Sequence, residues 1–255
     1  MSVELSVVIP AYNEAARLAP GLRRAAEYLE RRGLAFELLV IDDGSGDGTA
    51  EIAAGAGAAV LRHQRNLGKG AAVRTGVLAS RGDRVLVSDA DFSTPIEEIE
   101  KLEPRLREAE LVVGSRAVAG SMITQRQPFY RELMGKCFNL LIRALGVRGL
   151  RDTQCGFKLA RGDEARALCA EMKVDGFAYD VELIWLARRR GYRVAEVGVI
   201  WADSADSRVN PLRSSLAMLR DVIAMRLRHR SQRSHRSQRS QRSQRGQRGR
   251  GRGGR

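Results

Sequence analysis

Two carboxylates one residue apart, Asp89 and Asp91 with Ala90 between them, follow the apolar run 85–87. Like charges at this spacing repel each other and require water or a cation. Carboxylate oxygens suit hard divalent ions such as Mg²⁺ or Mn²⁺, and Mg²⁺ is commonly held by one or two carboxylates together with substrate phosphates. The spacing therefore indicates a metal site at Asp89 and Asp91. The alternative is that both carboxylates cap a helix expected to begin near Ile96.

Polar residues also follow three other apolar runs. The runs are 5–9, 36–41 and 111–113, and the polar residues after them are Tyr12-Asn13-Glu14, Asp42-Asp43 and Ser115-Arg116. Parallel α/β sheets bind their ligands at the carboxyl ends of their strands. Taken alone, Asp42-Asp43 is more typical of a turn or a helix cap. Four strand ends of this kind indicate one substrate-binding edge.

The elements that must position these residues alternate along the chain. Apolar runs predict strands at 5–9 (closed by Pro10), 36–41, 59–61, 85–88 and 111–113. Helical patterns are expected at 16–31, in a short segment that begins near Thr49, after Gly68-Lys69-Gly70 as far as Ser80, at 96–106, and in a segment that ends at Arg190. Strands that alternate with helices favour an α/β fold with a mostly parallel central sheet flanked by helices.

Two nucleotide-binding classes are excluded by the loops. A dinucleotide oxidoreductase needs G-x-G-x-x-G after the first strand, where this chain has Pro10-Ala11-Tyr12-Asn13-Glu14. A P-loop needs G-x-x-x-x-G-K-[ST], and Gly68-Lys69-Gly70 lacks both the upstream glycine and the following hydroxyl. A diphosphate is therefore expected to bind through a metal at Asp89 and Asp91.

Four motifs together resemble family 2 glycosyltransferases of the GT-A fold: residues 8–14, 42–45, 66–70 and 89–91. The resemblance implies a nucleotide-sugar site in which Glu14 and Asp43 face the nucleoside and the D-x-D motif binds a divalent ion on the diphosphate. The residues it assigns to the nucleotide sugar are Pro10, Tyr12, Glu14, Asp42, Asp43, Lys69, Asp89, Ala90, Asp91 and Arg208. Lys69 is equally well interpreted as a solvated lysine at a helix start.

The second half resembles the polyprenyl-phosphate sugar transferases over residues 114–116, 130–131, 152–158 and 177–183. The stretch 152–158, with Trp201 and Ser207-Arg208-Val209, is closer to the dolichyl-phosphate glucosyltransferase branch than to the mannosyl branch. The chain departs from the family where Phe92-Ser93 follows Asp91, which leaves a third metal ligand open. It also has no counterpart of the N-terminal membrane segment of the eukaryotic glucosyl enzymes.

The implied reaction is an inverting transfer of glucose from UDP-glucose to a polyprenyl (dolichyl-type) phosphate. A lipid phosphate is already an anion at neutral pH and needs cationic positioning rather than a strong base. Arginine suits this role because its planar fork contacts phosphate oxygens bidentately. The candidate catalytic residues are Asp91, Arg116 and Arg131, with Arg208 as a further phosphate contact. Arg131 is alternatively a solvated helix residue, and Asp180 and Glu182 are expected as helix-start carboxylates.

We expect a cytoplasmic protein that is peripherally associated with a membrane, because the polyprenyl acceptor implied by the resemblance has to be reached in a bilayer. No run of eighteen apolar residues and no signal peptide is seen, and three widely spaced cysteines indicate a reducing compartment. Two basic amphipathic patterns, 129–145 and 211–228, suit either a core face or a membrane interface. The second pattern places Leu212, Leu216, Leu219, Ile223 and Leu227 on one face.

The chain divides into residues 1–228, expected as one glycosyltransferase domain that ends in the amphipathic helix 211–228, and a tail of residues 229–255. Residues 231–255 hold nine arginines, no acid and no apolar residue, so they supply +9 of the net charge of +14 and leave +5 on the first 230 residues. Such a segment cannot bury a core and is expected to be disordered. It suits an anionic leaflet or nucleic acid, or it has no partner.

Two alternative functions therefore remain open. One is a mannosyl transfer from GDP-mannose on the same scaffold. The other is a nucleic-acid-binding protein that acts through the tail.

Overall fold

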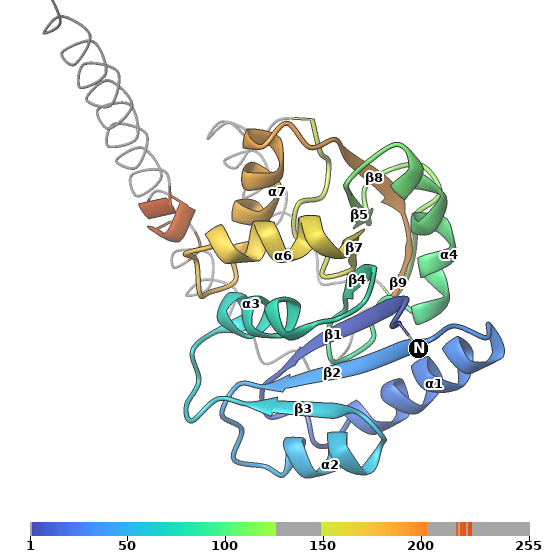
Figure 1. The fold of residues 1–255 in the computed structure, drawn as a ribbon, viewed down its shortest axis with the longest axis vertical. Coiled ribbons are helices and arrows are strands. Elements are labelled where there is room, and N and C mark those ends of the chain that lie inside the picture. The colour runs from blue at the N-terminus through green and yellow to red at the C-terminus, as the bar shows by residue number, and fades with distance from the viewer. Residues whose placement is uncertain (1, 126–148, 203–217, 219, 223, 226–255) are drawn as a thin grey trace, which may run out of the picture.

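A computed structural model describes residues 2–125, 149–202, 218, 220–222 and 224–225 (Figure 1). Within these residues a seven-stranded sheet has the order β3-β2-β1-β4-β7-β5-β8, and a separate two-stranded sheet pairs β6 with β9. The strands are β1 (Leu5–Ala11), β2 (Phe36–Asp42), β3 (Ala59–Arg62), β4 (Arg84–Val87), β5 (Leu111–Ser115), β6 (Met122–Gln125), β7 (Lys158–Arg161), β8 (Val194–Gly198) and β9 (Ile200–Ala202).

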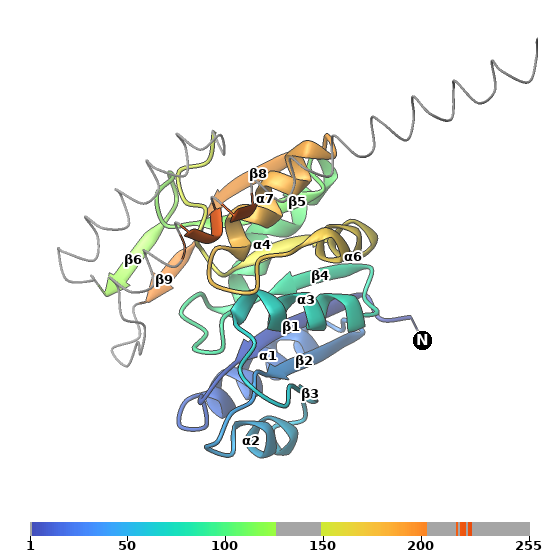
Figure 2. The ribbon, with the colours of Figure 1, turned by 90° about the vertical axis from the view of Figure 1, so that its left-hand side faces the viewer.

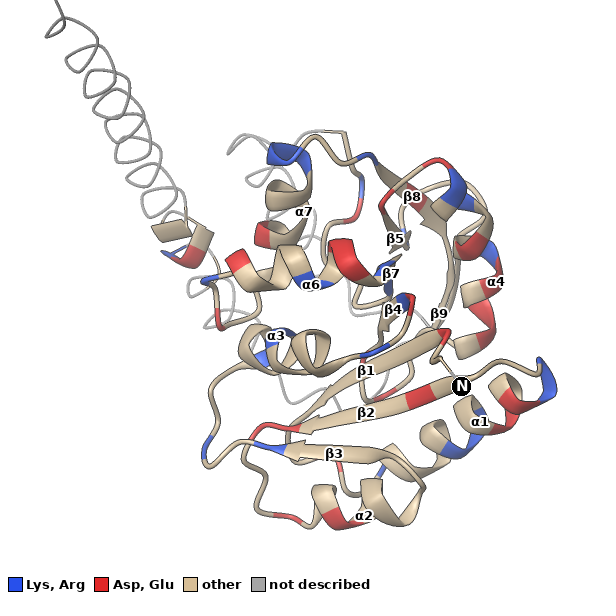
Figure 3. Ribbon diagram, in the orientation of Figure 1, with Lys and Arg blue, Asp and Glu red and all other residues tan. Residues whose placement is uncertain are grey.

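The helices cover both faces of the large sheet. They are α1 (Leu18–Arg31), α2 (Thr49–Gly55), α3 (Lys69–Ala79), α4 (Ile99–Leu102), α6 (Gly162–Glu171) and α7 (Tyr179–Arg189). Alternate side chains of β1 enter different cores: Val8 packs in the cluster formed with α3, α6 and α7, and Val7 packs in the cluster formed with α1 and α4. This period of two, with apolar residues on both faces, is typical of a strand buried between two helical layers. The charged residues lie mainly on the helices and near the strand ends (Figure 3).

The sheet is parallel except at β7. This strand runs antiparallel to both β4 and β5, and Lys158 lies opposite Val87 and Val113. Because β7 is reversed, the segment that leads into it arrives at the carboxyl ends of β4 and β5. The expected mostly parallel sheet is therefore confirmed, with one reversed strand that brings residues 152–158 to the substrate edge.

The first strand continues two residues beyond its expected end at Ile9. Pro10 and Ala11 extend the ladder with β2 as far as Asp42, whereas the ladder with β4 ends at Val8. Val8 faces β4, since its carbonyl accepts a bond from the Ser88 N–H, and Pro10 has the same parity along the strand. The missing N–H of Pro10 is therefore on the side of β4, and the ladder with β4 ends before it.

The expected helix at 96–106 is broken into short pieces. Residues Ile96–Glu98 and Glu103–Arg107 form 3₁₀ turns on either side of α4. Pro104 explains the change after Leu102, because a proline cannot donate the backbone hydrogen bond that an α-helix would need there.

The chain leaves the large sheet at two further places. Figure 2 shows β6 and β9 side by side, apart from the seven-stranded sheet.

Near the C-terminus, the described helical residues bury Val222 and Met225 in the core that α3, α6 and α7 share. The expected helix 129–145, most of the pattern 211–228 and the tail lie outside the described residues. Among the described helices, none is long and apolar enough to span a bilayer.

Candidate active site

Asp89 lies after β4 and binds Lys69 at the start of α3. Lys69 Nζ donates to Asp89 Oδ1 at 2.6 Å. Burial opposes charge on both groups, but the pair and its neighbours outweigh it. The pKa of Lys69 is raised by Asp89, Asp180 and Asp91, and the pKa of Asp89 is lowered by Lys69, Lys158 and Arg116. Lys69 thus contacts the D-x-D motif directly and is not a solvated helix residue.

Asp91 is in a different electrostatic environment. Its Oδ1 accepts the Ser93 N–H at 3.0 Å, and its Oδ2 lies 4.0 Å from Arg17 Nη1. Burial and the neighbouring Asp89 raise the pKa of Asp91. A positively charged group between Asp91 and Asp89 would offset both the cost of burying the Asp91 charge and its repulsion by Asp89.

The donor set at this position suits a hard divalent cation. The oxygens available belong to carboxylates, and burial, together with the neighbouring Asp89, raises the pKa of Asp91. Among the described residues, no group of three or more His, Cys, Asp or Glu side chains is arranged to enclose a metal ion. The residues therefore fit a divalent ion to which Asp91 and Asp89 provide some of the ligands. Oxygens of the substrate would provide others, as is common for Mg²⁺.

Arg116 follows β5 and is fixed by two contacts. Its Nε and Nη2 donate to Asp152 Oδ2 and Oδ1 at 2.7 and 3.0 Å, and its guanidinium lies 5.2 Å from the centre of the Trp201 ring. Burial opposes the charge, but Asp152 raises the pKa of Arg116, and Arg116 in turn lowers that of Asp152. The side chain is thus a permanent, oriented cation at the same edge as Asp89.

A second lysine lies beneath this edge. Lys158 is fully buried, bonds Asp180 and the Cys155 carbonyl, and lies 5.7 Å from the centre of the Tyr179 ring. Asp180, at the start of α7, was expected as a helix-start carboxylate, and it does occupy the first turn. Glu182 in the same turn accepts the backbone N–H groups of Lys173 and Val174.

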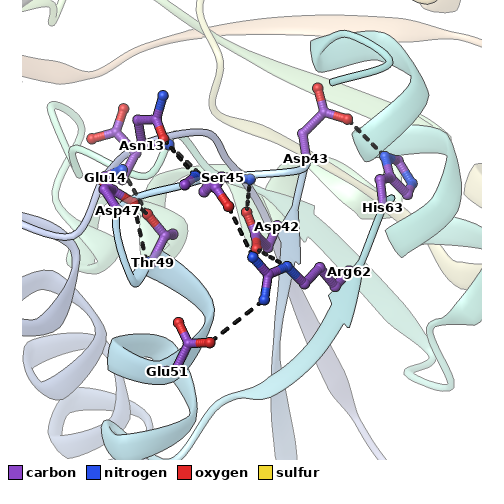
Figure 4. A network of polar contacts seen from close by, with 11 residues as sticks. Asn13, Glu14, Asp42, Asp43, Ser45, Asp47, Thr49, Glu51, Arg62 and His63 are labelled. Carbon is purple, nitrogen blue, oxygen red and sulfur yellow. Dashed lines mark hydrogen bonds and ion pairs between the residues drawn. The ribbon is translucent and has the colours of Figure 1, made fainter. Parts of the chain in front are cut away.

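The two loops after β1 and β2 bind each other (Figure 4). The Asn13 N–H donates to Ser45 Oγ and the Glu14 N–H donates to Thr49 Oγ1, both at 2.8 Å. Asn13 has φ +55, which asparagine tolerates better than most residues. The Glu14 carboxylate binds Arg17 one turn later, while Tyr12 remains exposed beside it. The loops form one wall of the edge.

Asp42 and Asp43 diverge after β2. Asp42 is fully buried, accepts the Ser45 N–H at 2.9 Å and pairs with Arg62 at 3.1 Å, so it fixes the turn (Figure 4). Asp43 accepts the N–H groups of Leu67 and Gly68 at 2.9 and 2.8 Å and contacts His63 Nδ1 at 2.7 Å. Asp43 therefore anchors the loop that leads directly to Lys69.

Most of the predicted site residues lie along one edge of the sheet. Pro10, Tyr12, Glu14, Asp42, Asp43, Lys69, Asp89, Ala90, Asp91 and Arg116 all follow or end β1, β2 and β4, begin α3, or follow β5. Arg131 and Arg208 lie outside the described residues, so their roles stay predictions.

Sequence reasoning assigned no role in the site to Arg17, His63 or Lys158. A lysine flanked by Phe157 and Leu159 in a strand was the one available signal, because a charge between apolar residues requires a buried partner.

The family model described as glycosyl transferase family 2 matches residues 6–166. A dolichyl-phosphate beta-glucosyltransferase of Homo sapiens is 35% identical over 245 residues, covering 89% of this chain and 76% of that protein. One from Dictyostelium discoideum is 33% identical, covering 89% and 75%, and one from Trichomonas vaginalis is 38% identical, covering 90% and 72%.

Solved structures show the same fold. Mannosyl-3-phosphoglycerate synthase from Rubrobacter xylanophilus matches with a TM-score of 0.71 at 23% identity, covering 90% of this chain and 75% of that one. Glucosyl-3-phosphoglycerate synthase from Mycobacterium tuberculosis, in complex with Mn²⁺ and UDP-glucose, matches with a TM-score of 0.64 at 25% identity, covering 88% and 78%. The expected nucleotide-diphospho-sugar transferase fold is confirmed.

Proposed function

Because the chain belongs to glycosyl transferase family 2, we propose that this hexosyltransferase moves glucose from UDP-glucose to a polyprenyl phosphate of the dolichyl type. The observation that supports the proposal most directly is the group of charges at the carboxyl edge of the sheet. Asp89, Asp91, Lys69 and Arg116 converge there from β4, α3 and β5. A reaction between two phosphate-bearing substrates requires carboxylates that hold a metal ion and, next to them, positively charged side chains that bind phosphate.

The proposed reaction is one displacement at the anomeric carbon. An oxygen of the acceptor phosphate forms a bond to C1 of glucose as the bond from C1 to the UDP oxygen breaks, and UDP leaves with the electron pair. Attack from the opposite face inverts an α-linked donor to a β-linked product. No proton transfer is needed because the acceptor is already an anion, so the protein contributes mainly positioning and electrostatic stabilisation.

The residues of the edge have separate proposed roles. A divalent ion, Mg²⁺ or Mn²⁺, would be held by Asp91 with Asp89 and would supply charge stabilisation for the departing diphosphate. Arg116, held by Asp152, orients the acceptor phosphate. Lys69 adds a second cation at the diphosphate while it holds Asp89. The loops after β1 and β2 receive the nucleoside, and Arg131 and Arg208 are further phosphate contacts.

We also propose that the protein works at a membrane surface from the cytoplasmic side, since a polyprenyl chain resides in a bilayer. The basic pattern 211–228 and the arginine-rich tail support peripheral contact with anionic lipid.

A donor screen tests the proposed function. Purified protein is incubated with Mg²⁺ or Mn²⁺, a polyprenyl phosphate, and radiolabelled UDP-glucose or GDP-mannose in separate tubes, and label in the extracted lipid is counted. Label from UDP-glucose alone is the expected result. Label from GDP-mannose alone would be consistent with the proposed fold and mechanism but would show that mannose is the transferred sugar. No label from either donor would overturn the assignment of the donor or of the acceptor.

The metal role of Asp91 is tested by Asp91→Ala. We expect a loss of turnover of about a hundredfold or more and the loss of metal-dependent UDP binding, measured by titration calorimetry with and without Mn²⁺. Asp163→Ala is the control, because the Asp163 carboxylate is 96% exposed and contacts Arg166 on α6. Unchanged metal-dependent binding in Asp91→Ala would remove Asp91 from the metal site.

A further inference from the structure

Gly156 lies directly against the carboxylate of Asp89. A Cβ atom at residue 156 would be 2.2 Å from both carboxylate oxygens of Asp89 and 2.4 Å from its Cγ. Ordinary contacts of a Cβ begin near 3.4 Å, so a side chain at residue 156 and the present position of Asp89 are incompatible. The two residues are far apart in sequence and meet because β7 runs antiparallel beside β4.

Backbone conformation does not account for this glycine. Gly156 is absent from the glycines with positive φ, such as Gly44 and Gly68, where left-handed backbone favours glycine. Its neighbours Cys155 and Phe157 are buried, so the backbone there is fixed by packing. The space taken by the Asp89 carboxylate is the remaining reason for a residue without a side chain.

We propose that Gly156 is a positioning residue whose missing side chain fixes the Asp89 carboxylate in its working place. The backbone at Gly156 closes one side of Asp89, and Lys69 Nζ holds Asp89 Oδ1 at 2.6 Å. If the Asp89 carboxylate turned away from this position, it would lose its hydrogen bond with Lys69 and its alignment with Asp91. The inference rests on the proposed function for its link to donor binding.

Adding a methyl group at residue 156 has a specific consequence. The atoms it meets are the end of a flexible side chain, and the Asp89 side chain is about one-third exposed, at 32%. Asp89 can therefore rotate toward solvent while the backbone stays in place. Gly156→Ala is expected to keep the fold and impair the site.

Gly162 is a matched control at the other end of β7. A Cβ atom at residue 162 would lie 2.2 Å from the Gly82 carbonyl oxygen and 2.7 Å from the Arg166 guanidinium. The clash is as short as at Gly156, but its closest partner is backbone, which cannot rotate away. Gly162→Ala is therefore expected to strain the fold and leave Asp89 and Lys69 undisturbed.

The experiment compares wild type, Gly156→Ala and Gly162→Ala by thermal unfolding and by steady-state kinetics with UDP-glucose and Mn²⁺. We expect Gly156→Ala to lose about a hundredfold in kcat/KM for the donor with little change in Tm. We expect Gly162→Ala to lower Tm by about 5 °C with near-normal kinetics at a temperature where it is folded. The two variants thus rank in opposite order on the two measurements.

Equal kinetic losses in the two variants, or normal donor kinetics in Gly156→Ala, would overturn the inference. A crystal structure of Gly156→Ala provides a readout that does not depend on the reaction. The expected structure has an unchanged β7 and no contact between Asp89 and Lys69, and an intact contact would also overturn the inference. A wild-type protein that neither binds UDP nor turns over nucleotide sugars would instead overturn the proposed function, leaving the structural readout to decide the inference.

Discussion

At the scale of single residues, the charges of the edge are mostly paired before any substrate binds. Lys69 pairs with Asp89, Arg116 with Asp152 and Lys158 with Asp180. Asp91 differs, because its nearest cation in the described residues, Arg17, is 4.0 Å away and its pKa is raised. The strongest attraction for an incoming cation is therefore expected at Asp91, with Asp89 kept in place by Lys69.

Arg116→Lys is expected to reduce kcat/KM for the acceptor by about 10- to 100-fold, since lysine keeps the charge and loses the two-pronged contact to Asp152 and the stacking on Trp201. Initial rates at varied acceptor concentration measure this loss. Arg81→Lys is the control, because Arg81 also binds a carboxylate through Nε and Nη2, that of Glu37, but near the amino end of β4. A similar loss in both variants would show that the effect is not specific to the site.

The D-x-D motif could be predicted from sequence because the two carboxylates follow a buried strand and only Ala90 separates them. Their partners could not be predicted. Asp152 is 36 residues from Arg116, and Asp180 is 22 residues from Lys158. Pairs so far apart in the sequence can be predicted only when the order of the strands in the sheet is known. Residue type and local spacing do not specify that order.

At the scale of elements, the strands before residue 116 follow from their apolar runs, and β7 does not. A four-residue run that contains a lysine carries little information on direction, and its antiparallel pairing depends on where the preceding chain turns. Helix 96–106 was predicted from its apolar period, but Pro104 breaks it. Periodicity therefore identified the elements, while reversal and interruption depend on tertiary structure and on single residues.

The C-terminal helix presents a second case at this scale. Val222 and Met225 bury one face in the core, yet the apolar stripe expected from sequence contains neither residue. Leu216 and Leu227 lie outside the described residues; in an ideal helix their spacing in the sequence would put them about 120° and 140° around the axis from Val222. The sequence thus provides two apolar faces, and the described residues bury one that the predicted stripe does not define.

Substitutions on the two faces are expected to have different effects. Met225→Ala removes a buried side chain and should lower the free energy of unfolding by about 2 kcal/mol or more, measured by denaturant titration. The double variant Leu216→Ser with Leu227→Ser should leave unfolding nearly unchanged and weaken sedimentation with polyprenyl-phosphate vesicles. Loss of stability in the double variant without loss of vesicle binding would contradict a membrane role for the stripe.

At the scale of the whole molecule, charge is distributed unevenly along the chain. The last 25 residues carry +9 of the net +14, whereas the substrate edge lies within residues 10–116 and 152–182. The tail is thus separate in sequence from the residues proposed to do chemistry, and the two can be tested separately.

Deletion of residues 231–255 is expected to leave turnover on a short, water-soluble acceptor phosphate within about twofold, because no proposed catalytic residue is removed. Binding to anionic vesicles should weaken, since each arginine near such a surface contributes about 1 kcal/mol. A full-length variant with the nine arginines replaced by glutamine separates charge from length. Loss of the sugar transfer on deletion, together with RNA binding by the tail, would favour the nucleic-acid alternative.

The reversed strand also has a consequence for the order in which the chain can fold. β1 to β4 pair with one another using only the first 87 residues, so this half of the sheet can form early during synthesis. β5 is made next, but its ladder partners are β7 and β8, which end at Arg161 and Gly198. Until those residues leave the ribosome, β5 has no partner strand and the edge of β4 stays open. Pairings between distant segments form slowly, so the nascent chain exposes the apolar edge of β4 from the synthesis of Val87 until Arg161 has emerged, and it is expected to need chaperone protection in that interval.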